Sequence, residues 1–177
     1  EISCSLVGSE MCIRDRANIQ AAFHFSGVAA HAANAPHLGR SALDAVTLMN
    51  TGANFLREHI IPDARLHYAV TNSGGSSPNV VQAEAEVLYL VRAPQLDQLQ
   101  DIYQRVTDIA RGAALMTGTE MTVRFEKACS NYQPNRALER LMYDRLCHFG
   151  LPDYSAEERQ FAAEIRQTLS ANDLRNA

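Results

Sequence analysis

The sequence predicts an α+β fold of the ferredoxin-like class, in which a four-stranded antiparallel sheet carries two helices on one face. Two kinds of pattern support this prediction. Four segments alternate apolar and polar residues as strands do, and two segments repeat apolar residues at helical spacing. Their order along the chain is β-α-β-β-α-β, and we place this domain at residues 17–128.

The first strand and the first helix follow from residues 19–62. The strand has apolar residues at alternate positions: Ile19, Ala21, Phe23 and Phe25. Ser41, with Asp44 three residues later, gives a capping-box start to the helix, which stops before Pro62. The apolar positions of this helix are Leu43, Val46, Leu48, Met49 and Phe55. A loop, "AAHAANAPHLGR", separates the two elements.

The next two strands are "RLHYAVTN" and "EAEVLYLVRA", which the loop "SGGSSPNVVQ" joins. A second helix covers about Gln95 to Met116, and Gly118 is its predicted C-terminal stop. The fourth strand is "EMTVRFEKA". In the usual ferredoxin-like order the strand "RLHYAVTN" lies at one edge of the sheet, so we expect it to pair with a second copy.

Residues 129–177 have a different pattern, with two helices at about 135–149 and 156–169 and no strands. Ser155 and Glu158 form a capping box at the start of the second of these helices. The first carries an apolar stripe of Leu138, Leu141, Met142 and Leu146. We expect this segment to be the start of a further, truncated domain.

The N-terminal stretch "EISCSLVGSEMCIRDR", residues 1–16, is interpreted as translated sequencing adapter rather than protein, and is expected to be disordered. It shows neither strand alternation nor a helical stripe, and "LVGSEMCIRD" can be encoded by DNA that resembles a transposon-based adapter. Leu6 to Gly8 is far too short for the apolar region of a signal peptide.

Composition argues against two classes of partner. The formal net charge is −4, and no basic block is present, so neither nucleic acid nor an anionic membrane is expected to bind. No apolar run approaches transmembrane length. Outside the first 16 residues the cysteines are Cys129 and Cys147, which we interpret as reduced, partly buried thiols of a cytoplasmic protein.

Two loops rich in small residues carry the candidate site. His31 lies in "GVAAHAANAPHLGR", while Gly74, Gly75 and Asn79 lie in "SGGSSPNVVQ", and Arg92 ends the following strand. Taken alone, a histidine in a loop is more often a surface residue, and a Gly-Gly pair is more often a simple turn.

Together, however, the loops resemble the lid, or dimerisation, domain of the dinuclear-zinc aminoacylase and carboxypeptidase family. The family pattern is G-x-x-x-H-A followed by Pro and a helix, then G-G-x-x-x-N-V-I-P before a strand that ends in Arg. The counterparts here are "GVAAHAANAP" and "GGSSPNVVQAEAEVLYLVR", with Gln82 where the family usually has proline. The resemblance covers Asn18 to Leu169, and "HLGRSALDAV", "GAALMTGTE" and "KACSNYQPNRALE" most resemble amidohydrolases of this family.

The resemblance implies an enzyme that cleaves the amide bond of N-acyl amino acids, as in p-aminobenzoyl-glutamate-like substrates. Two divalent metal ions, zinc or manganese, activate water in the full-length enzyme. Their ligands lie outside this chain, so the chain alone is expected to bind no metal and to be inactive. It further implies a homodimer through the lid, possibly with a second subunit type, and a catalytic domain to which residues 129–177 belong.

The resemblance also assigns roles to the site residues. His31 stabilises the oxyanion in the active site of the other subunit, Asn79 hydrogen-bonds the substrate, and Arg92 binds a substrate carboxylate. Gly74 and Gly75 let the backbone approach a ligand closely. A different class stays open from the residues alone, namely a free-standing ferredoxin-like regulatory module that binds a small molecule.

Overall fold

The computed structural model describes residues 16–150 and 152–176, so the predicted adapter segment lies, apart from Arg16, outside the described residues. The described chain divides into two compact units, one that ends at Tyr132 and one that begins at Gln133.

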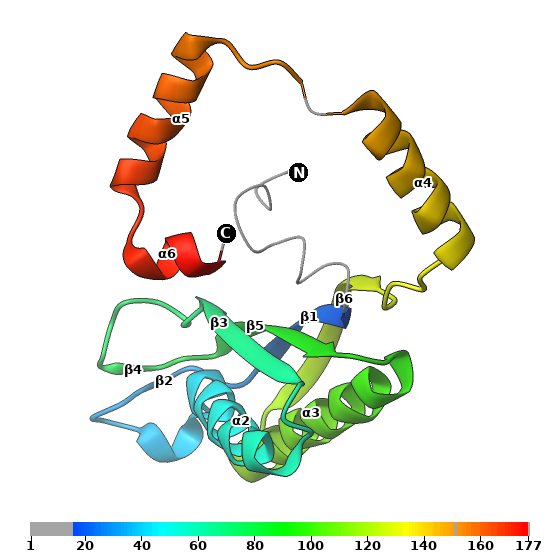
Figure 1. Cartoon of the computed structure of the whole chain (residues 1–177). Coiled ribbons are helices and arrows are strands. Elements are labelled where there is room, and N and C mark those ends of the chain that lie inside the picture. The colour runs from blue at the N-terminus through cyan, green and yellow to red at the C-terminus, as the bar shows by residue number, and fades with distance from the viewer. Residues whose placement is uncertain (1–15, 151, 177) are drawn as a thin grey trace. The chain divides into compact units, whose positions relative to one another are not determined.

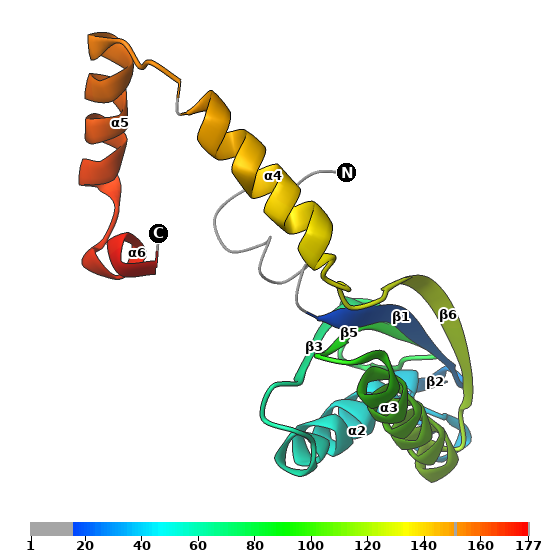
Figure 2. The ribbon, with the colours of Figure 1, turned by 45° about the vertical axis from the view of Figure 1, so that its right-hand side comes forward.

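The first unit is the predicted ferredoxin-like fold (Figure 1). Four antiparallel strands lie in the order β3-β5-β1-β6, and helices α2 and α3 pack side by side against one face of the sheet (Figure 2). The elements are β1 (Ala17–Ser26), α2 (Ala42–Leu56), β3 (Arg65–Asn72), β5 (Glu84–Ala93), α3 (Leu96–Thr117) and β6 (Glu120–Cys129). The predicted edge position of "RLHYAVTN", which is β3, is confirmed.

The core lies between the sheet and the two helices. On β1 and β5 the alternating residues that face the helices are buried, and their neighbours other than Ala22 are less so. The buried residues of these two strands include Ile19, Phe23, Phe25, Val87, Tyr89 and Val91. Leu99, Ile102 and Val106 of α3 and Val46 and Met49 of α2 complete the core from the helical side. The alternation and the helical spacing read from the sequence therefore identify the buried face.

The boundaries of α2 and α3 agree with the sequence prediction. Part of the apolar stripe predicted for α2, however, is not buried. Ser41 Oγ accepts the Asp44 N–H at 3.1 Å at the start of α2. Gly118 ends α3 in the left-handed conformation at φ 64°. Leu48 and Phe55, however, are 36% and 69% exposed. Three alanines of α2 are buried that the predicted stripe did not include, namely Ala42, Ala45 and Ala53.

Four short elements of the first unit were not predicted. The two-residue strands β2 (Ala30–His31) and β4 (Val80–Val81) pair antiparallel in a ladder of their own, separate from the main sheet. A short 3₁₀ turn, η1 (Pro36–Leu38), follows β2, and another, η2 (Arg57–His59), extends the end of α2. The ladder joins the two loops that hold the candidate site residues.

The second unit consists of α4 (Arg136–Phe149), α5 (Ala156–Thr168) and α6 (Ala171–Asn176). The capping box at α5 is confirmed, with Ser155 N–H donating to Glu158 Oε2 at 2.7 Å and Glu158 N–H to Ser155 Oγ at 3.2 Å. No described side chain of α4 or α5 is buried. Among the described helices, none has the length and apolar character needed to cross a membrane.

The prediction that Cys129 and Cys147 are partly buried is wrong, since both are free and exposed. Cys129 lies at the end of edge strand β6, and Cys147 lies on α4. Neither position packs against the core, which is confined to the first unit among the described residues.

Tyr89 links α2 to the strands. Its ring packs edge-on against Phe23 of β1 and tilted against Tyr68 of β3, and its hydroxyl donates to Asn50 Oδ1 on α2 at 2.7 Å. Burial, with a smaller contribution from Tyr68, raises the pKa of the Tyr89 phenol well above its usual range, because the phenolate would lose its hydration. Tyr89 is therefore a neutral hydrogen-bond donor in the folded protein.

Replacing Tyr89 by Phe is expected to lower the free energy of unfolding by about 1 kcal/mol near neutral pH, because Asn50 loses its donor. The pKa is raised on folding, so the contribution of the neutral phenol is complete below the ordinary tyrosine pKa of about 10. It falls as the pH rises above that value, where only the unfolded chain loses the proton.

Urea unfolding at about pH 7 and about pH 11 checks both effects. Wild type should lose more stability between the two pH values than Tyr89→Phe does. Tyr103→Phe, at a half-buried position of α3, is the matched control and should keep the wild-type loss. An identical pH dependence in wild type and Tyr89→Phe would contradict the assignment.

Candidate functional site

The β2–β4 ladder brings two of the predicted site residues together. His31 pairs with Val80, and the Ala32 N–H donates to the Asn79 carbonyl oxygen at 2.9 Å. His31 and Asn79 are therefore neighbours although 48 positions separate them in the sequence. A further bridge between Val28 and Arg40 closes the base of the first loop.

Hydrogen bonds orient the His31 ring. Its Nδ1 accepts the backbone N–H groups of Ala33 and Asn34, each at 3.2 Å. An Nδ1 that accepts two N–H groups has no proton of its own, so the neutral ring carries its proton on Nε2. The side chain is exposed, and Nε2–H is thus presented as a donor.

The Asn79 amide is oriented in a similar way by Ser77, which the sequence prediction missed. Ser77 Oγ donates to Asn79 Oδ1 at 2.7 Å, which fixes the oxygen of the amide toward the loop and leaves Nδ2 as the outward donor. The signal in the sequence is weak, because a serine two residues before an asparagine is common in turns. Together His31 and Asn79 offer two exposed donors on neighbouring strands.

The second loop begins with an Asn-capped turn, in which Asn72 Oδ1 accepts the Gly74 N–H at 2.9 Å. Gly74 has φ 81°, and a Cβ at this position would lie 2.5 Å from the Glu84 carbonyl oxygen. Gly75 has φ 117° with open space around it. The close approach that Gly74 permits is therefore to its own chain, and Gly75 is the position with room for a ligand.

The loop is held without the usual proline at position 82. Gln82 accepts the Ala42 N–H at its carbonyl oxygen at 2.8 Å, which ties the end of the loop to the start of α2. The Gln82 side chain packs beside Gly74. These contacts supply the rigidity that a proline gives to the family pattern.

Arg92 lies at the opposite end of the sheet from these loops. Ser26 of β1 pairs with Glu84 at the loop end of β5, whereas Asn18 of β1 pairs with Arg92. Eight residue steps separate Glu84 from Arg92, which corresponds to about 26 Å along a strand. The structure thus brings together His31, Asn79, Gly74 and Gly75, and it leaves Arg92 apart from them within one chain.

Glu84 and Glu86, on the open face of the sheet near the loops, have partners. Glu84 Oε2 lies 2.6 Å from His24 Nε2, so His24 has a structural partner. Glu86 pairs with Arg124 of β6 at 3.4 Å and accepts the Thr71 hydroxyl at 2.8 Å. The carboxylates of Glu84 and Glu86 are therefore already paired. His31 and Asn79, by contrast, have exposed donors that a ligand can reach.

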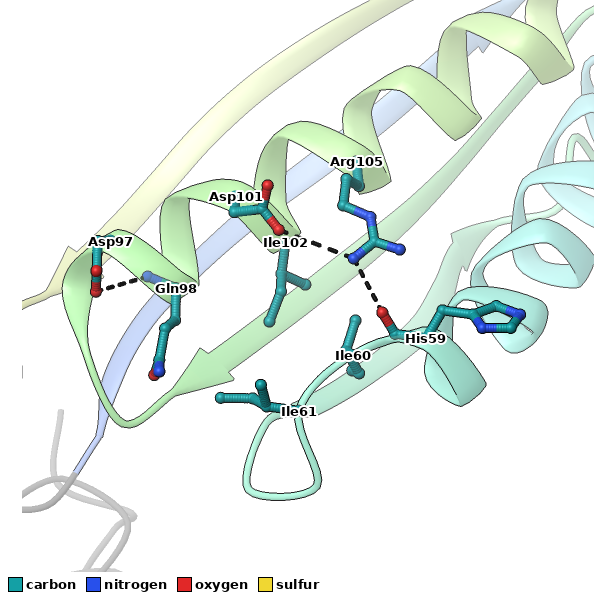
Figure 3. Close-up of a pocket in the computed structure, with 8 residues that line it drawn as sticks. All are labelled: His59, Ile60, Ile61, Asp97, Gln98, Asp101, Ile102 and Arg105. Carbon is teal, nitrogen blue, oxygen red and sulfur yellow. Dashed lines mark hydrogen bonds and ion pairs between the residues drawn. The ribbon is translucent and has the colours of Figure 1, made fainter.

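A groove of about 350 Å³ at the start of α3 is an alternative candidate site (Figure 3). Ile60 and Ile61 line one side, and Asp101 and Arg105 of α3 line the other. The Arg105 side chain donates to the His59 carbonyl oxygen at 3.0 Å and lies 3.8 Å from the Asp101 carboxylate. The guanidinium of Arg105 is thus already paired within the groove. No sequence-predicted site residue lines this groove.

The two divalent metal ions that the resemblance implies do not fit the residues in hand. Within residues 16–150 and 152–176, no three or more His, Cys, Asp or Glu side chains converge as ligands. Glu158 serves instead as a helix cap, as predicted. The predicted site residues instead offer hydrogen-bond donors, at His31 and Asn79, and one guanidinium group, at Arg92.

Solved structures with the same fold indicate the class of protein. The fold matches an aminobenzoyl-glutamate utilization protein from Klebsiella pneumoniae with a TM-score of 0.64 at 25% identity, over 75% of this chain and 33% of that one. An amidase of the hydantoinase/carbamoylase family from Burkholderia multivorans shares the fold with a TM-score of 0.60 at 18% identity, over 77% of this chain and 34% of that one. The chain thus shares the fold of part of this utilization protein and of this amidase.

The family described as "Peptidase dimerisation domain" matches residues 14–116, and the chain belongs to this family. It is 65% identical over 164 residues to one of the subunits of p-aminobenzoyl-glutamate hydrolase from Escherichia coli (strain K12), covering 93% of this chain and 34% of the relative. An Xaa-Arg dipeptidase of Mus musculus is 38% identical over 64% of this chain and 26% of its own length. The predicted family resemblance is confirmed, and the chain spans about a third or less of these relatives.

The two glycines of the second loop should differ in cost when replaced. Gly74→Ala is expected to lower the free energy of unfolding by about 2 kcal/mol or more, because a positive φ adds to a clash with the Glu84 carbonyl. Gly75→Ala is the control and should cost about 1 kcal/mol, from φ alone. Urea unfolding measures both, and equal costs would mean that the contact of Gly74 with Glu84 is not what fixes this loop.

Proposed function

We propose that this chain is the lid and dimerisation part of a metal-dependent amidohydrolase that cleaves N-acyl amino acids, with p-aminobenzoyl-glutamate-like amide bonds. The observation that carries the proposal is the pair of exposed donors, His31 Nε2–H and Asn79 Nδ2, which the β2–β4 ladder holds side by side. The 65% identity to a subunit of a p-aminobenzoyl-glutamate hydrolase supports the substrate class.

The donors suit the chemistry of amide cleavage. Attack of water on an amide carbonyl places negative charge on the carbonyl oxygen, and donors fixed beforehand stabilise that charge without reorganising. The backbone N–H groups of Ala33 and Asn34 hold the His31 ring so that Nε2–H remains available. Asn79, held by Ser77, adds a second donor that binds the substrate.

The position of Arg92 supports a site made from two subunits. Arg92 lies where the chain enters and leaves the sheet, beside Asn18 and across β1 from Cys129, while His31 and Asn79 lie at the far end. If β3 pairs antiparallel with β3 of a second copy about a two-fold axis, the partner's loop end is brought beside the Arg92 end. Arg92 of one subunit and His31 and Asn79 of the other then face one substrate, with Arg92 binding its carboxylate through a two-pronged contact.

The rest of the enzyme completes this proposal. Since the matched relatives are about three times as long as this segment, we infer that the ligands of the two divalent metal ions, zinc or manganese, lie in flanking parts of the whole protein. Residues 17–177 alone are then inactive, and residues 129–177 belong to the catalytic domain. The Escherichia coli relative is named as one subunit of its hydrolase, which supports a second subunit type besides the homodimer. The free thiols Cys129 and Cys147 support a cytoplasmic location.

Replacing His31 by Ala in the whole enzyme is expected to lower kcat on the order of a hundredfold, with little rise in KM, because the donor acts mainly on the transition state. Arg92→Ala should instead raise KM, because a carboxylate is held in ground state and transition state alike. Steady-state kinetics with p-aminobenzoyl-glutamate separates the two. His37→Ala, in the same loop, is the matched control and should change neither constant appreciably.

Mixed dimers test the action across subunits. A His31→Ala subunit paired with a subunit whose metal centre is disabled has one intact combination of lid and metal centre. Recovery of about a quarter to a half of wild-type activity per dimer is expected. No recovery from two folded, dimeric parents would place His31 in its own subunit or leave it only a packing role.

The edge-to-edge interface has its own test on the isolated chain. Val70 of edge strand β3 is 47% exposed, and Val123 of the opposite edge strand β6 is 37% exposed. Val70→Lys should raise the dimer dissociation constant at least about tenfold, because two copies of the charge meet near the axis. Light scattering over a range of concentrations should show a monomer for Val70→Lys and a dimer for wild type and for Val123→Lys. Dissociation by Val123→Lys alone would move the interface to β6.

A further inference from the structure

Two arginines lie side by side on the open face of the sheet. Arg65 of β3 pairs directly with Arg92 of β5, and the next pair, Leu66 with Val91, is buried under the helices. Because side chains alternate between the two faces of a strand, Arg65 and Arg92 both project from the face opposite α2 and α3. Directly opposed residues have Cβ atoms roughly 5 Å apart.

Like charges at directly opposed positions are unfavourable unless an anion compensates them. Among the described residues, no hydrogen bond or ion pair reaches the side chain of Arg92, and its Nε is shielded from solvent without a partner. Arg65 donates only to the carbonyl oxygens of Pro62 and Ala64. By contrast, Arg105, Arg111 and Arg124 each pair with a carboxylate. The pair therefore holds two positive charges that no described carboxylate neutralises.

Arg65 lies on the side of Arg92 that faces the edge of the sheet. Arg65 begins the edge strand β3, so it lies between Arg92 and the edge at which the second copy is expected to pair. In the proposed dimer Arg65 is therefore close enough to contact a substrate that Arg92 binds. The sequence pattern did not single out Arg65, because only the register of β3 on β5 places it opposite Arg92.

We propose that Arg65 and Arg92 bind the two carboxylates of a dicarboxylic amino acid, so that the enzyme selects N-acyl substrates whose amino-acid half is glutamate-like. This inference rests on the proposed function and deepens it. Arg92 holds the carboxylate next to the scissile amide, and Arg65 is the specificity-determining residue for the side-chain carboxylate. Each guanidinium matches one carboxylate as a planar fork.

The test compares p-aminobenzoyl-glutamate with p-aminobenzoyl-glutamine, which has the same shape but lacks the second charge. The whole enzyme, with its partner subunit where one is needed, is assayed for kcat and KM on both. Wild type should prefer the glutamate substrate. Arg65→Met should reduce this preference roughly tenfold to a hundredfold through KM, with the glutamine substrate almost unaffected.

Two further variants control the result. Arg92→Met should weaken both substrates, and Arg111→Met, an exposed arginine of α3, should leave both unchanged. Arg65→Lys keeps the charge without the fork, so it should retain part of the preference and provides the test if Arg65→Met does not fold.

The outcomes separate the two levels of the proposal. Equal losses on both substrates in Arg65→Met, or a wild type without preference for the glutamate substrate, would overturn the role of Arg65 and leave the amidohydrolase proposal intact. Hydrolysis of neither substrate by wild type would overturn the proposed function and this inference with it.

Discussion

The pairing of β5 with both of its neighbours is the constraint on which the rest of the structure depends. Ser26 faces Glu84 at one end of this central strand, and Arg92 faces Asn18 and Arg65 at the other. This register places the apolar residues of three strands on one face, where α2 and α3 cover them. A shift by one residue would turn the whole apolar set toward solvent, so the register is strongly specified. Tyr89, at the middle of β5, fastens the same strand to α2 through Asn50.

The same register divides the polar side chains between the two ends of the sheet. The loops after β1 and before β5 meet at one end, where the β2–β4 ladder joins them and where His31 and Asn79 present their donors. Arg92 lies near the other end of the sheet, because β5 runs from Glu84 at the loop end to Ala93. One copy of the chain therefore cannot offer the donors and Arg92 to one small substrate, which is the physical basis for proposing a site shared by two subunits. The edge position of β3 provides the two-fold contact that such a site needs.

Charge compensation separates structural arginines from those available for a ligand. Arg124 and Arg111 neutralise nearby carboxylates, and Arg105 pairs with Asp101 in the groove beside α3. Ion pairs of this exposed kind contribute little to stability, and they satisfy the groups involved. Arg65 and Arg92 differ because β-sheet pairing forces them together without a carboxylate among the described residues. A substrate anion would relieve that repulsion on binding. The register of β3 on β5, which sets Arg65 opposite Arg92, would in this way influence which substrates bind.

The sequence by itself determined the order of the elements, the buried face of β1 and β5, and the caps at Ser41, Gly118 and Ser155. These features depend on residues within a few positions of one another, so local periodicity and hydrogen-bonding chemistry are sufficient. The family pattern also singled out His31, Asn79 and Arg92, whose roles stay proposals.

Only the tertiary structure decided which of these side chains meet. The β2–β4 ladder, the orienting bonds from Ala33, Asn34 and Ser77, and the register that sets Arg65 against Arg92 all depend on the tertiary arrangement of the loops and strands. The exposure of Phe55 and Cys129 has the same cause, since burial depends on what another element covers. Periodicity along one chain segment carries no information about its distant partner, and so the position of Arg92 relative to His31 became visible only in the folded sheet.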